Sequence, residues 1–256
     1  MTTNPTQKIA LITGASRGLG KSAALHLAAQ GVAVIGTYHS KSADAQAVVA
    51  EIEAAGGQAA MLQLDVGDSS SFAGFGTALT DVLRSKFGRE RIDFLVNNAG
   101  VGVHAGVAET TEAQFDQMVN IHLKGPFFLT QTLLPMINDG GRILNISSGL
   151  TRFALPGYAA YASMKGAIEV WTRYLAKELG ARGIAVNTLA PGAIETDFGG
   201  GAVRDNVHLN NFVASVTALG RVGVPDDIGG AVAALLSDSS RWINAQRVEA
   251  SGGMFV

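Results

Sequence analysis

The sequence predicts an α/β protein built on one doubly wound parallel sheet with helices on both faces. Three observations support this fold class. Runs of β-branched and aliphatic residues alternate with longer amphipathic segments along the chain of 256 residues. The apolar runs are nearly uninterrupted, as expected for strands that are covered on both faces. Strands that alternate with helices pair in parallel through right-handed crossovers, which places helices on both sides of the sheet.

We expect about seven strands, each from a short apolar run. The predicted strands cover residues 8–13, 32–37, 59–65, 92–98, 141–147, 184–190 and, more weakly, 247–251. Between them, apolar residues recur at helical spacing and predict helices over 19–30, 42–55, 70–86, 112–138, 157–180 and 226–237. No linker or internal repeat divides the chain, so we expect a flexible tail over residues 1–7 and a single domain over 8–256.

Composition and charge argue against several classes of function. The net charge of −2 comes without a basic cluster or an acidic run, which argues against nucleic acid or an anionic membrane as a partner. The chain has no cysteine, which excludes disulfides and thiolate chemistry, and its five histidines lack metal-ligand spacing. Neither a leader-like start nor a membrane-length apolar run is present. We therefore expect a soluble cytoplasmic protein without a metal site.

The residues most typical of ligand binding and catalysis fall where predicted strands end. Residues 13–20 (TGASRGLG) follow the first strand, and residues 65–66 follow the third. Residues 97–100 (NNAG), 147–149 and 191–192 follow the fourth, fifth and sixth. The carboxyl ends of parallel strands meet at one edge of a sheet, where doubly wound proteins bind their ligands. We therefore expect one ligand site that collects residues from all of these turns.

The glycine-rich turn after the first strand suits a phosphate group. Gly14, Gly18 and Gly20 allow a tight turn and close approach of a diphosphate, and the amides that begin the next helix favour anions. A nucleoside-triphosphate loop is the alternative interpretation, because Gly20 precedes a Lys-Ser pair. The first glycine of that motif would have to stand where the chain has Ala15, so a phosphate-transfer ATPase is disfavoured.

Tyr161 and Lys165 are four positions apart on the predicted helix over 157–180, so their side chains share one face. Most such pairs lie on a protein surface. In a catalytic pair, the adjacent cation is expected to lower the pKa of the phenol by about two to three units, or ~3–4 kcal/mol. That shift would suit a general acid-base group, and Ser148 at the end of the fifth strand can join it at a carbonyl oxygen.

Together these motifs resemble the short-chain dehydrogenase/reductase family along nearly the whole chain, from about residue 8 to 253. The shared residues are Asn120 in VNIHLKG, Ser148, and the motifs TGASRGLG at 13–20, NNAG at 97–100, YASMK at 161–165 and PGAIETD at 191–197. The resemblance implies a Rossmann-fold oxidoreductase that passes a hydride between a nicotinamide and a carbonyl or alcohol carbon.

The resemblance also implies roles for individual residues. Tyr161 would be the acid-base residue, and Lys165 its tuner and a ligand of the ribose hydroxyls. Ser148 would hold the substrate oxygen, and Asn120 would hold a water that relays protons. Hydride addition builds negative charge on oxygen, which hydroxyl donors stabilise and protonate. Tyr158 lacks a cation four positions later, so we expect it to form a wall of the substrate pocket.

The predicted cofactor is NADP(H). An acid about twenty residues past the glycine turn normally holds an unphosphorylated ribose, and Tyr38 stands there instead. His39 and Ser40 add hydrogen-bond donors. Lys41 and Arg17 add positive charge, which suits a ribose phosphate. The remaining predicted cofactor contacts come from the glycine turn, the strand ends and the catalytic helix: Gly14, Ser16, Gly18, Leu19, Gly20, Asp65, Val66, Asn97, Ala99, Gly100, Tyr161, Lys165, Pro191, Gly192, Ile194 and Thr196.

Residues 193–220 are the predicted substrate loop. Three consecutive glycines at 199–201 precede a short amphipathic stretch, which is typical of a mobile flap. Apolar side chains in and near this loop would line the pocket: Phe153, Leu155, Tyr158, Phe198 and Phe212. Residues 242–246 (WINAQ) depart from the commonest pattern of the family, which weakens any transfer of its subunit contacts.

The favoured function is NADPH-dependent reduction of a ketone or aldehyde to the alcohol, with a small molecule as substrate. Three alternatives stay open: a 3-oxoacyl reductase acting on an acyl carrier protein or coenzyme A thioester, a sugar or polyol dehydrogenase, and a non-catalytic nucleotide-sensing protein. Arg152 and Arg204 are the basic residues near the loop that would suit an acidic acyl carrier. Apolar residues beyond one face of the helices over 112–138 and 157–180 predict a homodimer or homotetramer.

Overall fold

The structure, a computed structural model, describes residues 7–256, and the strands in this range form one parallel sheet. In sequence order the strands are β1 (Ile9–Ile12), β2 (Ala33–Tyr38), β3 (Ala59–Gln63), β4 (Ile92–Asn97), β5 (Ile137–Ile146), β6 (Ala185–Pro191) and β7 (Arg247–Ala250). Their order across the sheet is β3-β2-β1-β4-β5-β6-β7, and every neighbouring pair is parallel. The predicted fold class is confirmed.

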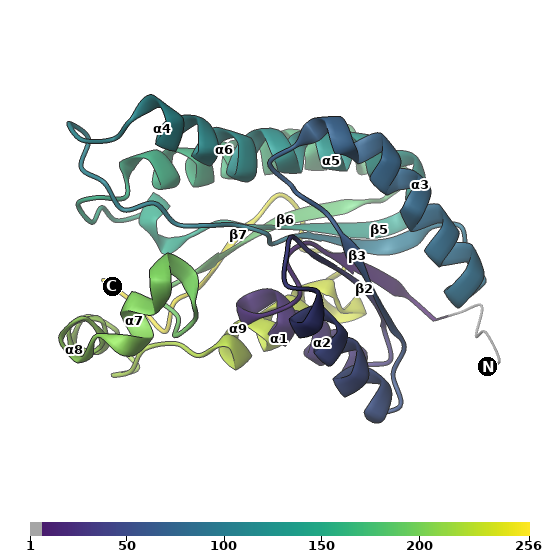
Figure 1. Cartoon of the computed structure of the whole chain (residues 1–256), viewed down its shortest axis with the longest axis horizontal. Helices are drawn as coiled ribbons and strands as arrows, with labels where there is room; N and C mark the ends of the chain where they lie inside the picture. The colour runs from purple at the N-terminus through teal and green to yellow at the C-terminus, as the bar shows by residue number, and fades with distance from the viewer. Residues whose placement is uncertain (1–6) are drawn as a thin grey trace.

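Helices cover both faces of the sheet (Figure 1). One face carries α1 (Gly18–Ala29), α2 (Ser42–Ala54) and α9 (Pro225–Leu236). The other carries α3 (Phe72–Val82), α4 (Glu112–Val119), α5 (Gly125–Leu133) and α6 (Ala159–Glu178). Two short helices, α7 (Ala202–Asp205) and α8 (Val207–Ser215), lie at one end of the molecule near the C-terminus. They belong to the predicted substrate loop.

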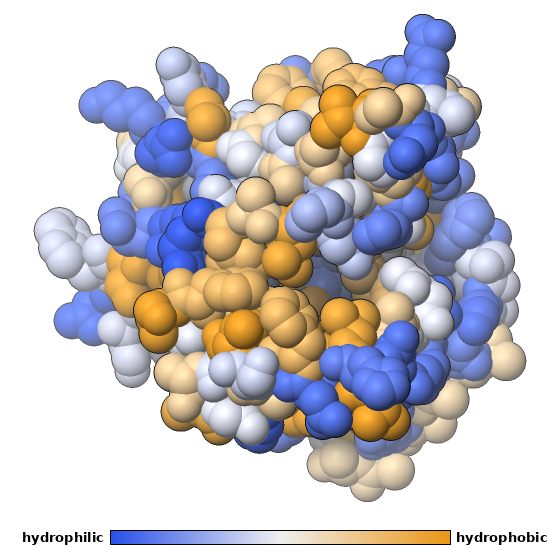
Figure 2. All heavy atoms as spheres, turned by 90° about the vertical axis from the view of Figure 1, so that its left-hand side faces the viewer, coloured by the Kyte–Doolittle hydropathy of each residue, from blue (hydrophilic) through white to orange (hydrophobic). Residues whose placement is uncertain are grey.

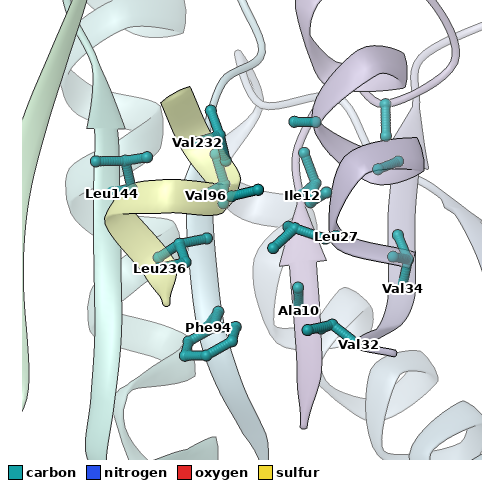
Figure 3. Close-up of a cluster of buried hydrophobic side chains, with 14 of the residues drawn as sticks. Ala10, Ile12, Leu27, Val32, Val34, Phe94, Val96, Leu144, Val232 and Leu236 are labelled. Carbon is teal, nitrogen blue, oxygen red and sulfur yellow. The ribbon is translucent and has the colours of Figure 1, made fainter. Parts of the chain in front are cut away.

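The core consists of two apolar layers, one on each face of the sheet. Figure 3 shows the first layer, in which Ile12 and Val96 of the central strands pack with Leu27 of α1 and Val232 of α9. The second layer joins Leu95 of β4 to buried side chains of α3, α5 and α6. Each fully buried aliphatic side chain contributes roughly 1.5–3 kcal/mol. Because both faces are covered, the strands appear in the sequence as continuous apolar runs.

The predicted helix over 112–138 is wrong in its middle and at its end. α4 passes into a π-helical turn, Asn120–Lys124, before α5, and a 3-10 turn, Leu134–Met136, ends the segment. β5 begins at Ile137 rather than at residue 141, because Ile137 is buried and pairs with Ile92 of β4. Apolar spacing alone does not distinguish these turns from a continuous helix.

Three further expectations concern the N-terminal tail, the membrane and a metal site. The predicted tail over 1–7 lies outside the described residues except for Gln7, whose Nε2 donates a hydrogen bond to Gly31 O at 2.9 Å. Within residues 7–256, no helix combines the length and the apolar character needed to cross a membrane. In the same part of the chain, no three His, Asp or Glu side chains are grouped as metal ligands.

Candidate active site

The glycine-rich turn lies directly against the turn that follows β4. Gly14 has φ +69°, and a Cβ there would lie 2.9 Å from Ala99 Cα. A Cβ on Gly20 would lie 2.6 Å from Asn98 Nδ2. Only glycine therefore allows the two turns to meet this closely. α1 begins at Gly18, so its free amides face the same edge of the sheet, which fits the predicted diphosphate.

Asn98 fixes this contact, and the sequence analysis did not assign it a role. Its Nδ2 donates to Thr13 O at 2.8 Å and to Gly14 O at 3.2 Å. Thr13 Oγ1 in turn accepts from the backbone amides of Asn98 and Ala99 at 2.9 and 3.0 Å. The second Asn of the NNAG motif was the available signal. The turn is thus held from both sides before any ligand binds.

Asn97, the other Asn of the motif, lies in a buried polar chain. Its Nδ2 donates to Thr130 Oγ1 at 3.1 Å and to Asn145 Oδ1 at 2.8 Å. Asn145 donates to Thr172 Oγ1 at 2.9 Å, and Thr188 donates to the same hydroxyl at 2.9 Å. These bonds tie β4, β5 and β6 to α5 and α6. The location agrees with the predicted support of the central strand, and contact of Asn97 with the cofactor stays a prediction.

The predicted adenosine end of the site lies after β2 and β3. Tyr38 ends β2 half-buried, and His39, Ser40 and Lys41 follow it exposed to solvent. His39 Nε2 lies 3.6 Å from Asp65 Oδ2, beside a surface depression of about 400 Å³ that both residues line. Val66, next in the chain, packs against the core. The structure thus brings the predicted ribose and adenine contacts to one place.

The rest of the predicted cofactor surface lies around the glycine turn. Ser16 is half-buried, and Leu19 packs against the first core layer. Arg17 is exposed, and its Nη1 lies 3.2 Å from Asp197 Oδ2 of the substrate loop. Gly100 packs so closely against His122 that an added Cβ would lie 2.7 Å from its Cε1.

The catalytic candidates meet where α6 crosses the end of β5. Tyr161 is 8% exposed and Lys165 is 5% exposed, so this pair is not a surface pair. The Ser148 hydroxyl lies beside the Tyr161 phenol, close enough to lower its pKa. Lys165 Nζ donates to Ile146 O at 2.7 Å and lies 5.5 Å from the centre of the Tyr161 ring. Three of the four predicted catalytic residues are therefore brought together.

The expected fall in the pKa of Tyr161 is wrong for this structure. Burial raises the pKa of the phenol well above its usual value, and the hydrogen bond with Ser148 opposes this only in part. Burial also lowers the pKa of Lys165 to about 7. Removal of the charged form from water outweighs the attraction of a cation that titrates near neutrality. The phenol therefore stays protonated at neutral pH, which is the state that a proton donor needs.

Asn120, the fourth candidate, begins the π-helical turn. Its side chain makes no hydrogen bond to any other residue of the range 7–256, and its water-holding role stays a prediction. His122, two positions later, is 1% exposed and lies edge-on to Tyr161, with 5.0 Å between ring centres. Its Nε2 is 2.7 Å from Val101 O, while Nδ1 has no partner among the described residues.

His122 is thus a residue beside Tyr161 that was not among the predicted site residues. Burial, followed by the charge of Lys165, lowers the pKa of His122 to about 3. The ring is therefore neutral, and Nε2 carries the proton that it donates to Val101 O. A histidine within the apolar segment VNIHLKG was the available signal. Within this motif, Asn120 was the residue predicted to have a role in catalysis.

The substrate loop lies over Tyr161. Gly199, Gly200 and Gly201 have φ of +62°, +75° and +80°. Residues other than glycine rarely adopt this left-handed backbone conformation. Just before this run, the Phe198 ring lies 5.5 Å from the Tyr161 ring, between ring centres. Figure 2 shows this end of the molecule, with a hollow that apolar side chains border on the left and below and hydrophilic side chains border at the upper right.

The strand-end residues after β6 form the base of this loop. Pro191 ends β6, and Gly192 N donates to Ala250 O at 3.1 Å. Ile194 forms a β-bridge with Gly223. Thr196 faces the glycine turn, since its Cγ2 would lie 3.7 Å from a Cβ on Gly18.

The predicted pocket residues separate into two groups. Phe198 contacts Tyr161, and Tyr158 makes an edge contact with His104, with ring centres 5.0 Å apart. Phe153 and Phe212 pack instead against Phe255 near the C-terminus, at 4.8 and 6.4 Å between ring centres, and Leu155 is half-buried. Among the predicted pocket residues, Phe198 is therefore the one whose ring lies against the Tyr161 ring.

Comparison with known proteins identifies the family of this chain. The family model described as Enoyl-(Acyl carrier protein) reductase matches residues 14–255. Tetrahydroxynaphthalene reductase PfmaG of Pestalotiopsis fici is 36% identical, over 96% of this chain and 91% of that protein. Versicolorin reductase of Emericella nidulans is 33% identical, over 97% of this chain and 96% of that protein.

Solved structures of ketoreductases are also similar to this chain. The reductase LugOII, which catalyses keto-reduction in lugdunomycin biosynthesis, superposes with a TM-score of 0.92 at 39% identity, over 97% of this chain and 98% of its own. The angucycline C-6 ketoreductase LanV with bound NADP superposes with a TM-score of 0.92 at 36% identity, over 97% of this chain and 95% of its own. The predicted resemblance is confirmed, and the chain belongs to the short-chain dehydrogenase/reductase family of oxidoreductases.

Proposed function

We propose that this protein reduces a ketone carbonyl to the alcohol with NADPH, and that Tyr161 donates the proton. The observation that carries the proposal is the position of the Ser148 hydroxyl beside the buried Tyr161 phenol, at the edge of the sheet that also holds the glycine turn. Two hydroxyl groups there can donate to one carbonyl oxygen. When bound, NADPH supplies the hydride that reduces the carbonyl carbon.

The residues of the chain supply the remaining steps. Ser148 and Tyr161 donate hydrogen bonds to the carbonyl oxygen and stabilise the negative charge that develops on it. The O–H bond of Tyr161 then breaks and its proton forms the new alcohol O–H, which leaves a phenolate. Lys165, in its protonated form, stabilises that phenolate and can return a proton to it. Asn120 keeps its proposed role as the holder of a water that resupplies the proton.

The proposed choice of NADPH rests on the residues after β2 and on Arg17. The turn after Tyr38 holds His39, Ser40 and Lys41 without a carboxylate of its own. Arg17 is paired with Asp197 through an exposed contact at 3.2 Å. Exposed pairs contribute about 0–1 kcal/mol, so Arg17 can exchange Asp197 for a ribose phosphate at little cost. A higher kcat/KM with NADPH than with NADH is expected, and a ratio below one would contradict this choice.

The proposed substrate is a ketone on a fused aromatic ring system. Phe198 offers an aromatic face beside Tyr161, and the named relatives act on hydroxynaphthalene, versicolorin or angucycline compounds. An acyl carrier protein fits less well. Arg152 is already bound by Glu249 at 2.7 and 2.8 Å, and Arg204 by Asp197 and Asp205 at 2.6 and 2.7 Å. The aromatic face of Phe198 beside Tyr161 also suits a polyol poorly.

The test is a steady-state assay that follows the change in NADPH absorbance with five substrates. These are a fused-ring aromatic ketone, an aliphatic ketoester, a 3-oxoacyl thioester, an enoyl thioester and, in the reverse direction with NADP, a polyol. The highest kcat/KM is expected for the aromatic ketone. Faster turnover of the enoyl thioester would overturn the proposed carbonyl chemistry, whereas faster turnover of the 3-oxoacyl thioester would overturn only the substrate class.

We also propose that the protein is a cytoplasmic homo-oligomer. The outer surface of α4, α5 and α6 exposes several large apolar side chains: Phe115, Phe127, Phe128, Val170 and Tyr174. Phe127 stacks near Trp171 of α6, with 5.5 Å between ring centres, so the aromatic residues of two helices are continuous. Such a patch is typical of a subunit interface. Analytical ultracentrifugation is expected to give a dimer or tetramer, and the mass of one subunit would contradict it.

A further inference from the structure

Glu169 of α6 holds together the segment that carries Ser148. Its Oε1 accepts three hydrogen bonds: from Ser147 Oγ at 2.7 Å, Thr151 Oγ1 at 2.7 Å and Arg247 Nε at 2.8 Å. Ser147 and Thr151 stand on either side of Ser148 in the chain. One carboxylate therefore ties both flanks of the Ser148 segment to the helix that carries the proposed proton donor.

Arg247 of β7 completes this arrangement from the other side. Its Nη2 donates to Ser148 O at 3.3 Å and to Thr151 Oγ1 at 3.1 Å. Its Nη1 donates to Glu249 at 2.8 Å, and Glu249 also accepts from Arg152 Nε at 2.8 Å. The two arginines and two glutamates balance in charge. Charge-assisted bonds of this kind are about twice as strong as neutral ones.

We propose that Glu169, together with Arg247, is a positioning residue that fixes the Ser148 hydroxyl relative to the Tyr161 phenol. The inference rests on the proposed roles of these two hydroxyls. Tyr161, Lys165 and Glu169 follow at intervals of four on α6, so they lie along one side of the helix. Both hydroxyls must reach the same carbonyl oxygen, and a displacement of about 1 Å at such a site can cost ~10²-fold in rate.

The hydrogen bonds of Glu169 differ from the local hydrogen bonds within the Ser148 turn, because they join the turn to another helix. Ser148 is the N-cap of its own 3-10 turn, and its Oγ accepts from Leu150 N at 3.2 Å. That bond sets the local conformation of the segment but does not connect it to α6. The bonds of Glu169 make this connection. Loss of Glu169 is therefore expected to leave the turn folded while Ser148 shifts relative to Tyr161.

The experiment compares Glu169→Gln and Glu169→Ala with Glu178→Gln, an exposed glutamate near the end of the same helix. The Ala variant is expected to lower kcat by about 10²-fold, and Gln by about tenfold because its amide oxygen can still accept from the two hydroxyls. The NADPH dissociation constant, measured by fluorescence, should stay within about twofold. Glu178→Gln should match the wild type. Circular dichroism and the melting temperature check folding.

A double-mutant cycle with Ser148→Ala separates positioning from general destabilisation. If Glu169 acts through Ser148, Glu169→Gln should lower kcat in the wild-type background but have little effect when Ser148 is already absent. Equal losses in both backgrounds would overturn the inference, as would an unchanged kcat in folded Glu169→Ala. If Ser148→Ala alone keeps full activity, the proposed role of Ser148 fails instead, so the two failures are distinguishable.

Discussion

The two sides of the proposed active site are held by different forces. On one side, the end of β5 meets α6 through buried and part-buried hydrogen bonds, among them those that Lys165 donates to Ile146 and Ser147 donates to Glu169. On the other side, residues 197–204 of the substrate loop are held by exposed ion pairs around Asp197 and by the contact of Phe198, itself 41% exposed, with Tyr161. The first side has the stronger contacts, because buried and charge-assisted bonds lose less to water than exposed pairs.

This difference separates reaction chemistry from substrate choice. Hydroxyl groups that serve one oxygen atom must stay aligned, and β5 with α6 provides the rigid support for them. A loop built on three left-handed glycines can move at a low energetic cost to admit a bulky ring system. Variants on the α6 side should therefore change turnover, and variants in the loop should change apparent substrate affinity.

The largest effect is expected from Tyr161→Phe. The variant keeps the ring but removes the proton donor, so kcat should fall by about 10²–10⁴-fold. Binding of NADPH, measured by fluorescence titration, should change little. Ordinary activity in this variant would disprove the role of Tyr161.

Lys165→Met tests how burial of the Lys165 ammonium on the α6 side changes the pH dependence of the free energy of unfolding. The folded pKa of Lys165 is about 7 against an ordinary value of 10.5, so between these values the unfolded chain binds more protons. The contribution of Lys165 to the free energy of unfolding should therefore rise with pH, by up to ~1.4 kcal/mol per unit. Urea unfolding from about pH 7 to 9 should show this rise in the wild type relative to the variant. Parallel pH profiles would contradict it.

His122→Leu tests whether the π-helical turn supports Tyr161. The change removes the hydrogen bond to Val101 O and the edge contact with the Tyr161 ring, so kcat should fall about tenfold. Asn120→Ala is the matched variant in the same turn. If Asn120 holds the proton-relay water, its variant should instead show a changed solvent isotope effect on kcat. Wild-type values in both variants would show that neither side chain contributes.

Phe198→Ala tests the loop side. Loss of the aromatic face should raise KM for a fused-ring ketone by about tenfold, because an aromatic contact contributes ~0.5–1.5 kcal/mol beyond buried area. The kcat should change less than in the α6 variants. Phe212→Ala, which removes a ring that packs near the C-terminus rather than on Tyr161, is the control. A fall in kcat with unchanged KM would assign Phe198 to the reaction chemistry.

The smallest effect is expected from Asp197→Asn. The variant weakens the ion pairs with Arg17 and Arg204, which are exposed to solvent and therefore weak. Arg17 would then be free for a ribose phosphate, so KM for NADPH should fall by about twofold while KM for NADH stays constant. An equal change for both cofactors would show that Arg17 does not distinguish them.

Much of the fold and of the candidate site was predictable from local sequence patterns. Continuous apolar runs are typical of strands buried on both faces, so the parallel sheet and its seven strands were predictable. The interval of four between Tyr161 and Lys165 places both on one side of a helix in any environment. The positions of the glycine turn and of Asn97 at strand ends likewise placed them at one edge of the sheet. These features depend on backbone geometry, which residues close in sequence determine.

Features that depend on surroundings required the tertiary structure. The pKa of Tyr161 rises because elements distant in sequence exclude water from the phenol, a change that spacing does not reveal. His122, which lies against Tyr161, stands in a π-helical turn that interrupts the expected helix. Glu169 meets Arg247 across 78 positions of sequence. Sequence periodicity reports which side of an element a residue occupies, whereas desolvation and long-range hydrogen bonds depend on what packs against that side.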